Sequence, residues 1–257
     1  MDAKSLSRER FSRYAAGYVS SPTHAAGSGL DRLLDIVRPQ PHWRVLDVAT
    51  GGGHTALLFA PRVASVVASD LTPEMLKAAE RHLCSRGATN VTFELADAEN
   101  LPFEAEQFDL VTCRLAAHHF PAPMRFMYHA VRVLRPGGVI LVQDQMVPDD
   151  PVAAAFINEF ERLRDPSHKE ALQRARWQGL LEEVGLTIRN VVTLAQRHGL
   201  ADWAERQGCS SDTTQQLGTV LESATSVARA WLEPFDVGTA SASFLIHQII
   251  ICGEKPA

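Results

Sequence analysis

The central half of the chain alternates short apolar runs with segments of helical periodicity. Between the runs, apolar residues recur every three or four positions, as at Met75, Ala79 and Leu83, and this spacing predicts helices. Alternation of this kind predicts βαβ units and a parallel sheet with right-handed crossovers. Five runs rich in β-branched residues are the expected strands: 44–49, 64–69, 90–95, 108–113 and 139–143.

The two ends of the chain have weaker patterns. Phe11, Tyr14 and Tyr18 fall on one face of an expected helix over 4–19, and this face either packs on the body or forms a lid over a ligand. Further elements are expected beyond the central strands: helices at 30–37, 149–164, 169–184 and, broken by the GCSSD segment, 202–232, and strands at 186–194 and 242–252. We expect one domain over 1–257. Segment 1–40 would form lid helices, segment 41–145 the core, and segment 146–257 the insertions and the final strands.

Composition excludes several classes of protein. The 257 residues are 46% hydrophobic and 21% charged, which is typical of a globular chain with a full core. The 25 basic and 30 acidic side chains give a net charge of −5, and no block of Lys or Arg is present, which argues against a nucleic-acid partner. No apolar run is long enough for a membrane span or a signal peptide.

The cysteines predict a reducing compartment. They show no CxxC pairing, so neither a disulfide framework nor a structural zinc site is expected, and we predict a cytoplasmic protein. The residues are Cys84, Cys113, Cys209 and Cys252.

A glycine turn joins the first expected strand to a helix in the segment DVATGGGHTA. The glycines permit close backbone approach to a ligand, and the helix N-terminus offers free N–H groups. Gly51-x-Gly53-x-x-Ala56 also matches the dinucleotide fingerprint. Asp70, at the end of the second strand, suits any nucleotide, because its carboxylate can accept hydrogen bonds from two ribose hydroxyls.

Other acidic residues help to decide whether the expected ligand is of the NAD type or is a different nucleotide. Asp47 lies inside the first strand, where an acid suits an amine-bearing ligand and not a pyrophosphate. Asp97 follows the third strand, where a carboxylate can accept from an adenine amino group. The segments FDLV at 108–111 and VLRPGG at 133–138 follow in order.

The run from Val45 to Gln143 resembles a class I S-adenosylmethionine-dependent methyltransferase of the ubiquinone/menaquinone-biosynthesis-like group, methyltransferase type 11. The segments 18–31 and 164–168 resemble a small bacterial branch of that group. The resemblance implies a Rossmann-like, doubly wound α/β sheet, mostly parallel, with an antiparallel C-terminal strand and helical insertions that form a cap. It also implies S-adenosylmethionine as cofactor, S-adenosylhomocysteine as product, and a cofactor-binding core over 41–145.

The resemblance implies roles for the residues around the methionine part of the cofactor. Asp47 would orient the cofactor's amino end, directly or through water. Ala49, Gly51 and Gly53 would give close backbone approach, although the family usually has glycine where Ala49 stands. The carbonyl of Arg114 would lie near the cofactor amine.

The nucleoside part has its own set of implied contacts. Asp70 would hold the ribose hydroxyls, and Leu71 and Met75 would pack on the adenine. Asp97 would bind the adenine amino group, and the Ala98 N–H would reach a ring nitrogen. From the expected lid, Tyr18 joins the cofactor-binding residues.

His118 and His119 are the candidate catalytic residues. They follow the fourth strand, at the carboxyl edge of the sheet where such folds bind ligands, and a histidine there could take a proton from a phenol, enol or amine. Alternatively, they bond to the backbone or position the substrate. Since adjacent side chains usually point apart, we expect one of them at most to act as a base. No carboxylate or cysteine completes a metal site, so no metal is expected, and His168, His198 and His247 are interpreted as isolated.

The expected function is methyl transfer to a small molecule, at carbon or oxygen, by in-line displacement. Phe156, Phe160 and Trp203 either line the acceptor pocket or pack ordinarily, and a pocket roofed by helices favours a small apolar or aromatic acceptor. Three alternatives stay open. One is a protein of the same fold that binds S-adenosylmethionine for other chemistry, and one is an NAD-type oxidoreductase, which Asp47 and Asp97 disfavour. The third is a nucleic-acid methyltransferase, which the missing basic patch disfavours. The oligomeric state is not predicted.

Overall fold

The computed structural model describes residues 3–20 and 29–257, with the side chains of 14–20 and of Asp31 outside the description. Its main feature is an eight-stranded sheet in the order β3-β2-β1-β4-β5-β8-β7, with β6 paired to β5 off this path. The strands are β1 (Arg44–Val48), β2 (Ser65–Asp70), β3 (Val91–Leu95), β4 (Phe108–Arg114), β5 (Leu134–Val147), β6 (Leu172–Gln173), β7 (Thr187–Gly199) and β8 (Ser243–Glu254). The first five strands pair in parallel and β8 is antiparallel to both neighbours, which confirms the expected sheet.

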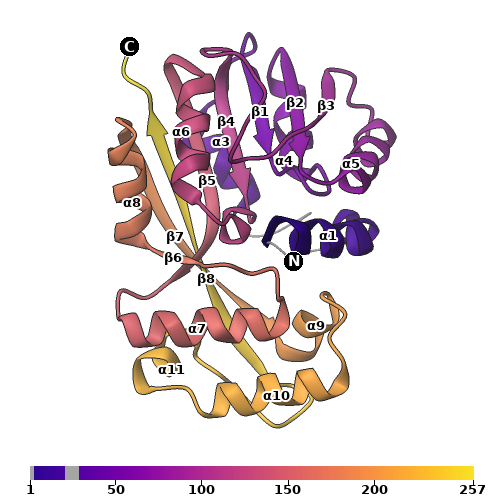
Figure 1. The fold of residues 1–257 in the computed structure, drawn as a ribbon, viewed down its shortest axis with the longest axis vertical. Coiled ribbons are helices and arrows are strands. Elements are labelled where there is room, and N and C mark those ends of the chain that lie inside the picture. The colour runs from indigo at the N-terminus through magenta and orange to yellow at the C-terminus, as the bar shows by residue number, and fades with distance from the viewer. Residues whose placement is uncertain (1–2, 21–28) are drawn as a thin grey trace.

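Helices cover both faces of the upper part of this sheet (Figure 1). Helices α6 (Pro123–Val133) and α8 (Arg174–Glu183) pack with the sheet in one apolar cluster, which includes Phe126 and Trp177. A second cluster joins the sheet to α3 (Leu30–Val37), α4 (His54–Phe59) and α5 (Pro73–Ser85). A 3-10 turn, Ala60–Arg62, follows α4. The strands between the two clusters are therefore buried on both sides, as their apolar composition predicts.

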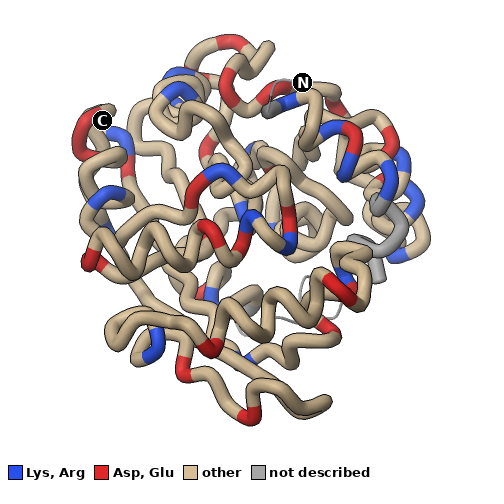
Figure 2. The backbone as a smooth tube through the Cα atoms, turned by 60° about the horizontal axis from the view of Figure 1, so that its bottom comes forward, with Lys and Arg blue, Asp and Glu red and all other residues tan. Residues whose placement is uncertain are grey.

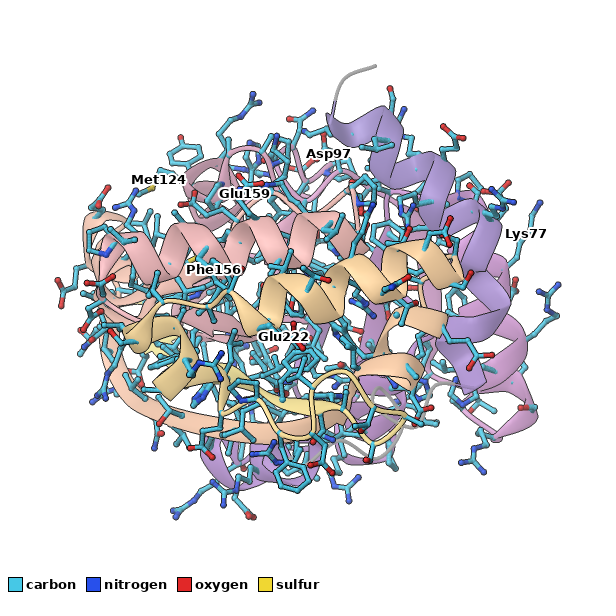
Figure 3. All side chains as sticks on the ribbon, turned by 90° about the horizontal axis from the view of Figure 1, so that it is seen from below. Lys77, Asp97, Met124, Phe156, Glu159 and Glu222 are labelled. Atoms are coloured by element: carbon cyan, nitrogen blue, oxygen red, sulfur yellow. The ribbon has the colours of Figure 1, made fainter. Side chains whose placement is uncertain are left out.

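Below the core, the long strands β5, β7 and β8 continue into a helical cap (Figure 1). Helices α7 (Pro151–Arg164), α9 (Leu200–Glu205), α10 (Ser211–Glu222) and α11 (Ser226–Leu232) share an apolar cluster with the lower ends of β5 and β8. Figure 3 shows α7 and α10 side by side across this face, with Phe156 and Glu222 marking them. The expected helical cap is confirmed, whereas the division into three segments of one domain stays a prediction.

Several element boundaries differ from the sequence-based expectation. Strand β5 begins at Leu134 and not at residue 139, because Leu134 pairs with Phe108 before a register shift. Helix α8 begins at Arg174 and not at residue 169. Lys169 instead donates its N–H to the carbonyl of His118, and β6 pairs with β5. The helical region expected over 202–232 is broken twice, at 206–210 and at 223–225.

Charge and hydropathy are unremarkable over the described chain. Basic and acidic residues are mixed along the backbone and form no large field of one sign (Figure 2). None of the described helices has the length and apolar character needed to cross a membrane. The absence of a nucleic-acid partner stays a prediction.

Candidate functional site

A cleft of about 910 Å³ opens at the carboxyl ends of β1, β2, β3 and β4. We call it the glycine-loop cavity. It is lined by residues 49–52, 54–55, 70–72, 75, 96–99, 114–116 and 119–121, together with Lys4, Ser7 and Phe11. The last three come from helix α1 (Ala3–Ser20), which lies between core and cap in Figure 1. Nine of the predicted site residues line this cavity: Ala49, Gly51, Asp70, Leu71, Met75, Asp97, Ala98, Arg114 and His119.

The glycine turn after β1 has left-handed backbone at three positions, with φ of 53° at Ala49, 54° at Gly51 and 80° at Gly53. A Cβ atom on Gly51 would meet nothing within 4 Å, so the backbone there opens onto the cavity. A Cβ atom on Gly53 would lie 2.2 Å from a methyl group of Leu83. Gly53 therefore serves the packing of the turn on α5 and does not line the cavity. Ala49 shows that the turn accepts a methyl group where the family usually has glycine.

Asp70 fixes the glycine turn to the start of α5. One carboxylate oxygen accepts from the N–H of Gly51 at 3.0 Å, and the other accepts from the N–H of Thr72 at 3.0 Å. Burial raises the pKa of Asp70 to about 6, although these two N–H groups oppose the shift. A carboxylate has about four acceptor sites, so Asp70 can still accept from a ligand with two hydroxyl groups.

Asp47 lies beneath the turn and not in the cavity wall. It is 1% exposed and accepts hydrogen bonds from the hydroxyls of Thr50 at 2.6 Å and Thr112 at 2.7 Å. The predicted direct contact with a ligand amine is therefore absent from the lining, and Asp47 acts on the cavity through Thr50. Arg114 does line the cavity, and its Nε donates to the Thr55 hydroxyl at 3.0 Å. Burial lowers the pKa of Arg114 to about 10.

Helix α1 closes one side of the cavity through residues that the sequence analysis missed. The Lys4 ammonium donates to Asp97 at 2.6 Å and lies 2.6 Å from Glu99, which is 3% exposed. Asp97 also accepts from the N–H of Glu99 at 2.9 Å. The hydroxyl of Ser7 is buried and finds no hydrogen-bond partner among the described residues. The signal for this face was the i, i+3, i+7 spacing of Lys4, Ser7 and Phe11.

Of the aromatic face that was expected either to pack on the body or to form a lid, the structure describes only the side chain of Phe11, and the lid stays a prediction. Phe11 lines the cavity and packs edge-on against His119, with ring centroids 4.9 Å apart. The side chains of Tyr14 and Tyr18 lie outside the described residues, so the predicted role of Tyr18 stays a prediction.

A second cavity, of about 670 Å³, adjoins the first, and we call it the histidine cavity. The two cavities share Phe11, Leu115 and His119 as a common wall. The rest of the second lining is mostly polar: His118, Gln145, Glu161, Arg164, Asp165, His168, His198, Trp203, Arg206, Gln207, Ile246 and Gln248. The 164–168 segment, singled out in the sequence, thus supplies part of this wall.

The histidines converge, contrary to expectation. His118 and His119 lie in a 3-10 turn, Ala117–His119, with ring centroids 4.2 Å apart. Successive side chains in such a turn are only about 120° apart, so the expectation that they point apart was wrong. The His168 ring lies 5.4 Å from that of His118, and His198 lines the same cavity, so neither is isolated. His247 bonds to the carbonyl of Trp231 at 2.7 Å and is absent from both linings.

Hydrogen bonds define the protonation of the adjacent pair. His118 Nδ1 lies 2.5 Å from a carboxylate oxygen of Asp144, a fully buried residue. Burial lowers the pKa of His118, but Asp144 outweighs burial and the net shift is upward. Burial lowers the pKa of His119 to about 4, and the charge of His118 adds to the shift. His119 Nδ1 lies 3.0 Å from the carbonyl of Ser167, which can only accept, so Nδ1 carries the proton and Nε2 is the acceptor.

The large apolar residues of the cap mostly pack in its own core. Phe160 stacks on Trp203 at 5.0 Å, and both contact Phe244. Phe156 is partly buried against the same cluster, and of the three predicted lining residues only Trp203 reaches the cavity. Of the two alternatives stated for these rings, ordinary packing holds for Phe156 and Phe160, whereas Trp203 both packs in the cluster and lines the histidine cavity; a small apolar or aromatic acceptor stays a prediction. Among the described residues, no group of three or more His, Cys, Asp or Glu side chains could hold a metal ion, and the absence of a metal stays a prediction.

Comparisons with known proteins place the chain in a family. Residues 46–142 match the model of a methyltransferase domain. The chain is 33% identical over 246 residues to the uncharacterized methyltransferase YcgJ of Bacillus subtilis, covering 95% of this chain and 97% of that protein. It is 36% identical over 141 residues to the ubiquinone/menaquinone biosynthesis C-methyltransferase UbiE of Ectopseudomonas mendocina, covering 51% of this chain and 55% of that one.

A solved structure extends the likeness to the whole fold. A crystal structure from Bacillus halodurans C-125 shares 36% identity at a TM-score of 0.86, covering 90% of this chain and all (100%) of that chain. These similarities set aside the NAD-type oxidoreductase. The chain belongs to the class I S-adenosylmethionine-dependent methyltransferases.

Proposed function

We propose that this enzyme transfers a methyl group to a small-molecule acceptor, at carbon or oxygen, with S-adenosylmethionine in the glycine-loop cavity and the acceptor in the histidine cavity. The observation that carries the proposal is the common wall of the two cavities, formed by Phe11, Leu115 and His119. A methyl donor and its acceptor must meet in line at a short distance, and orientation alone can supply several kcal/mol, about 7 or more in favourable cases. Adjoining cavities provide this arrangement.

The residues of the glycine-loop cavity fit the cofactor. The open backbone at Gly51 allows close approach, and the unpartnered hydroxyl of Ser7 among the described residues offers a further contact. Asp70 would hold the ribose hydroxyls, while Leu71 and Met75 would pack on the adenine. When bound, S-adenosylmethionine supplies a methyl group on a positively charged sulfur, and this chain supplies alignment.

The adenine amino group and ring nitrogen would be recognised by Asp97 and Ala98. Asp97 is already bonded to Lys4, so cofactor binding uses its remaining acceptor capacity. Because Lys4 belongs to α1, this contact ties the adenine end of the cavity to the helix that closes it.

His119 is the proposed base. The ring is neutral near pH 7, and its Nε2 can accept a proton from an acidic O–H or C–H of the acceptor. Its low basicity suits an acceptor whose proton is itself acidic. The His118 ring lies next to it, tilted by 45°, and Asp144 stabilises positive charge that forms on the pair.

Two matched experiments test the two halves of the proposal. Calorimetric titration with S-adenosylhomocysteine should show at least about tenfold weaker binding for Asp70→Asn, the loss of a charge-assisted hydrogen bond, than for the unchanged chain. Asp109→Asn is the control, because Asp109 is equally buried but bonds to Arg44 and lies outside both linings. Equal affinity of the Asp70 variant would remove Asp70 from the cofactor site.

The acceptor is found by transfer of a radiolabelled methyl group to a panel of phenols, enols and keto acids. On the best acceptor, His119→Gln should lower turnover by about 100-fold or more, and His247→Gln should not. Unchanged turnover would remove His119 as the base. Tight cofactor binding with no transfer to any of the panel would favour the alternative, a non-methylating use of the cofactor.

A further inference from the structure

His198 carries a buried N–H group with no partner. Its Nδ1 lies 3.3 Å from Nη2 of Arg206, and a guanidinium has donors only, so Nδ1 is the acceptor. The neutral ring therefore carries its hydrogen on Nε2. His198 is 7% exposed and lines the histidine cavity, yet Nε2 has no hydrogen-bond partner within the described chain. A buried donor of this kind is costly unless a ligand satisfies it.

Arg206 is a half-buried cation whose Nη2 lies at Nδ1, the other nitrogen of the His198 ring. It forms no salt bridge with any described carboxylate, and burial together with the charge of Arg164 lowers its pKa. Arg164 lines the same cavity, donates to the carbonyl of Trp203 at 2.8 Å and lies over the Trp203 ring. Two guanidinium groups thus face one small space next to an unpartnered N–H.

The acidic residues of the cavity do not cancel this charge. Asp165 is committed to Ser167, which donates to it through both N–H and hydroxyl, and to Arg10 at 3.1 Å. Glu161 is 3.9 Å from Arg164, and burial raises its pKa to about 7, so it is partly protonated at neutral pH. An uncharged apolar ligand would leave the His198 N–H without an acceptor. It would also remove water from the half-buried Arg206, which has a nearby negative charge in Asp202 but no carboxylate in contact, and both effects are unfavourable.

We propose that the methyl acceptor carries an anionic oxygen group, a carboxylate or a phosphate, that binds His198 Nε2 and the guanidinium of Arg206 while its reacting atom lies at the common wall beside His119. This inference rests on the proposed function, because it takes the histidine cavity as the acceptor site. The planar fork of an arginine matches two oxygens of such a group, and the N–H of His198 adds a third donor. Acceptors without an anionic group are then poor substrates.

The test measures binding and needs no turnover. The chain, saturated with S-adenosylhomocysteine and also alone, is titrated with benzoate, phenyl phosphate and the neutral analogue benzamide. The ring signals of His198 are followed by NMR of ¹⁵N-histidine-labelled protein and assigned with His198→Gln. We expect at least one anion to shift the His198 signals and to bind at least about tenfold more tightly than benzamide, a difference of about 1.4 kcal/mol. The two anions distinguish a carboxylate site from a phosphate site.

Two arginine variants test whether the anion binds at Arg206. Arg206→Gln should weaken binding of the preferred anion about tenfold or more. Arg197→Gln should not, because Arg197 pairs with Glu233 on the outside of the cap. Arg206→Lys, which keeps the charge but loses the fork, should fall between them.

The outcome is decisive even if a variant fails to fold. If neither anion shifts the His198 signals of the unchanged chain more than benzamide does, the proposal is overturned. The same holds if Arg206→Gln binds the anion as tightly as the unchanged chain. Such a failure alongside normal S-adenosylhomocysteine binding leaves the proposed methyl transfer intact, whereas absent cofactor binding contradicts that function first.

Discussion

An added methyl group should affect mainly the stability of the chain at one glycine of the turn after β1 and mainly its affinity for the cofactor at the other. Gly53 has a φ of 80°, and its added Cβ would lie 2.2 Å from Leu83, a fully buried residue. Gly51 has a φ of 54°, and its Cβ would enter the open cavity. Gly53→Ala therefore tests packing, and Gly51→Ala tests approach of the cofactor.

The magnitudes follow from the geometry. An alanine in the left-handed region costs about 1–2 kcal/mol, a penalty that both variants carry. The overlap with Leu83 adds an overpacking cost of about 1–3 kcal/mol at Gly53 alone. We expect Gly53→Ala to lose about 2–5 kcal/mol of stability and about 5–15 °C in Tm, and Gly51→Ala to lose about half of that or less.

The assay pairs thermal unfolding with calorimetric titration of S-adenosylhomocysteine. Gly51→Ala should bind the ligand at least about tenfold more weakly at a temperature where it is fully folded. Gly53→Ala, measured well below its Tm, should keep most of its affinity. Equal destabilisation by the two changes, or normal ligand affinity in Gly51→Ala, would refute the reasoning.

Three further predictions concern charge. Because burial raises the pKa of Asp70 to about 6, S-adenosylhomocysteine affinity should be level above pH 6 and fall about tenfold per pH unit below it, and Asp70→Asn should remove this dependence. Since the folded chain binds this proton more tightly than the unfolded chain, the contribution of Asp70 to stability should decrease as the pH rises from about 4 to 6. Lys4→Ala should speed dissociation of S-adenosylhomocysteine about fivefold in stopped-flow experiments, as expected for the loss of two partly buried ion pairs. Lys77→Ala, whose side chain points away from the body in Figure 3, should have no effect. Asp144→Asn should lower the pKa of His118 and cost about 3 kcal/mol of stability, since only the smaller effects of Glu161 and Asp165 then oppose burial; an unchanged histidine titration by NMR would count against the Asp144–His118 pairing.

The core of the fold could be predicted because its signals are local. Strands β1 to β4 lie within a residue or two of the expected runs. Strands β1, β2 and β4 are mostly buried and carry apolar sequence, whereas the residues of the edge strand β3 are exposed or half-buried. The long end of β7 could not be predicted, because exposed and half-buried residues follow one another along it and it is extended only by pairing with β8. The ends of β5 could not be predicted because they depend on distant partners: Leu134 pairs with β4, and Met146 and Val147 pair with β6. The two-residue strand β6 likewise exists only through its partner.

The candidate site also has one part that could be identified from the sequence and one part that could not. The glycine-loop residues follow one another closely in sequence, so the turn, Asp70 and Asp97 could be identified from spacing and resemblance. The histidine cavity draws on separate segments, and only the sheet topology brings Asp144, Ser167 and His198 near the histidine pair. The sequence left open whether Phe156, Phe160 and Trp203 line a pocket or pack ordinarily, because a helical face shows that a residue is buried, without showing against what.

The continuous strands between core and cap have a mechanical consequence. Strands β7 and β8 stay paired from Thr187–Glu254 to Gly199–Ser243, so a hinge between the two halves would have to bend a hydrogen-bonded ribbon. The cap is therefore rigidly joined to the core, and ligands enter and leave by movement of α1. Ionic contacts such as Lys4 with Asp97 and Arg10 with Asp165 hold this helix in place. Contacts of that kind weaken as salt screens them, whereas the apolar clusters do not. Ionic strength should then set how fast this enzyme opens without changing how firmly it is folded.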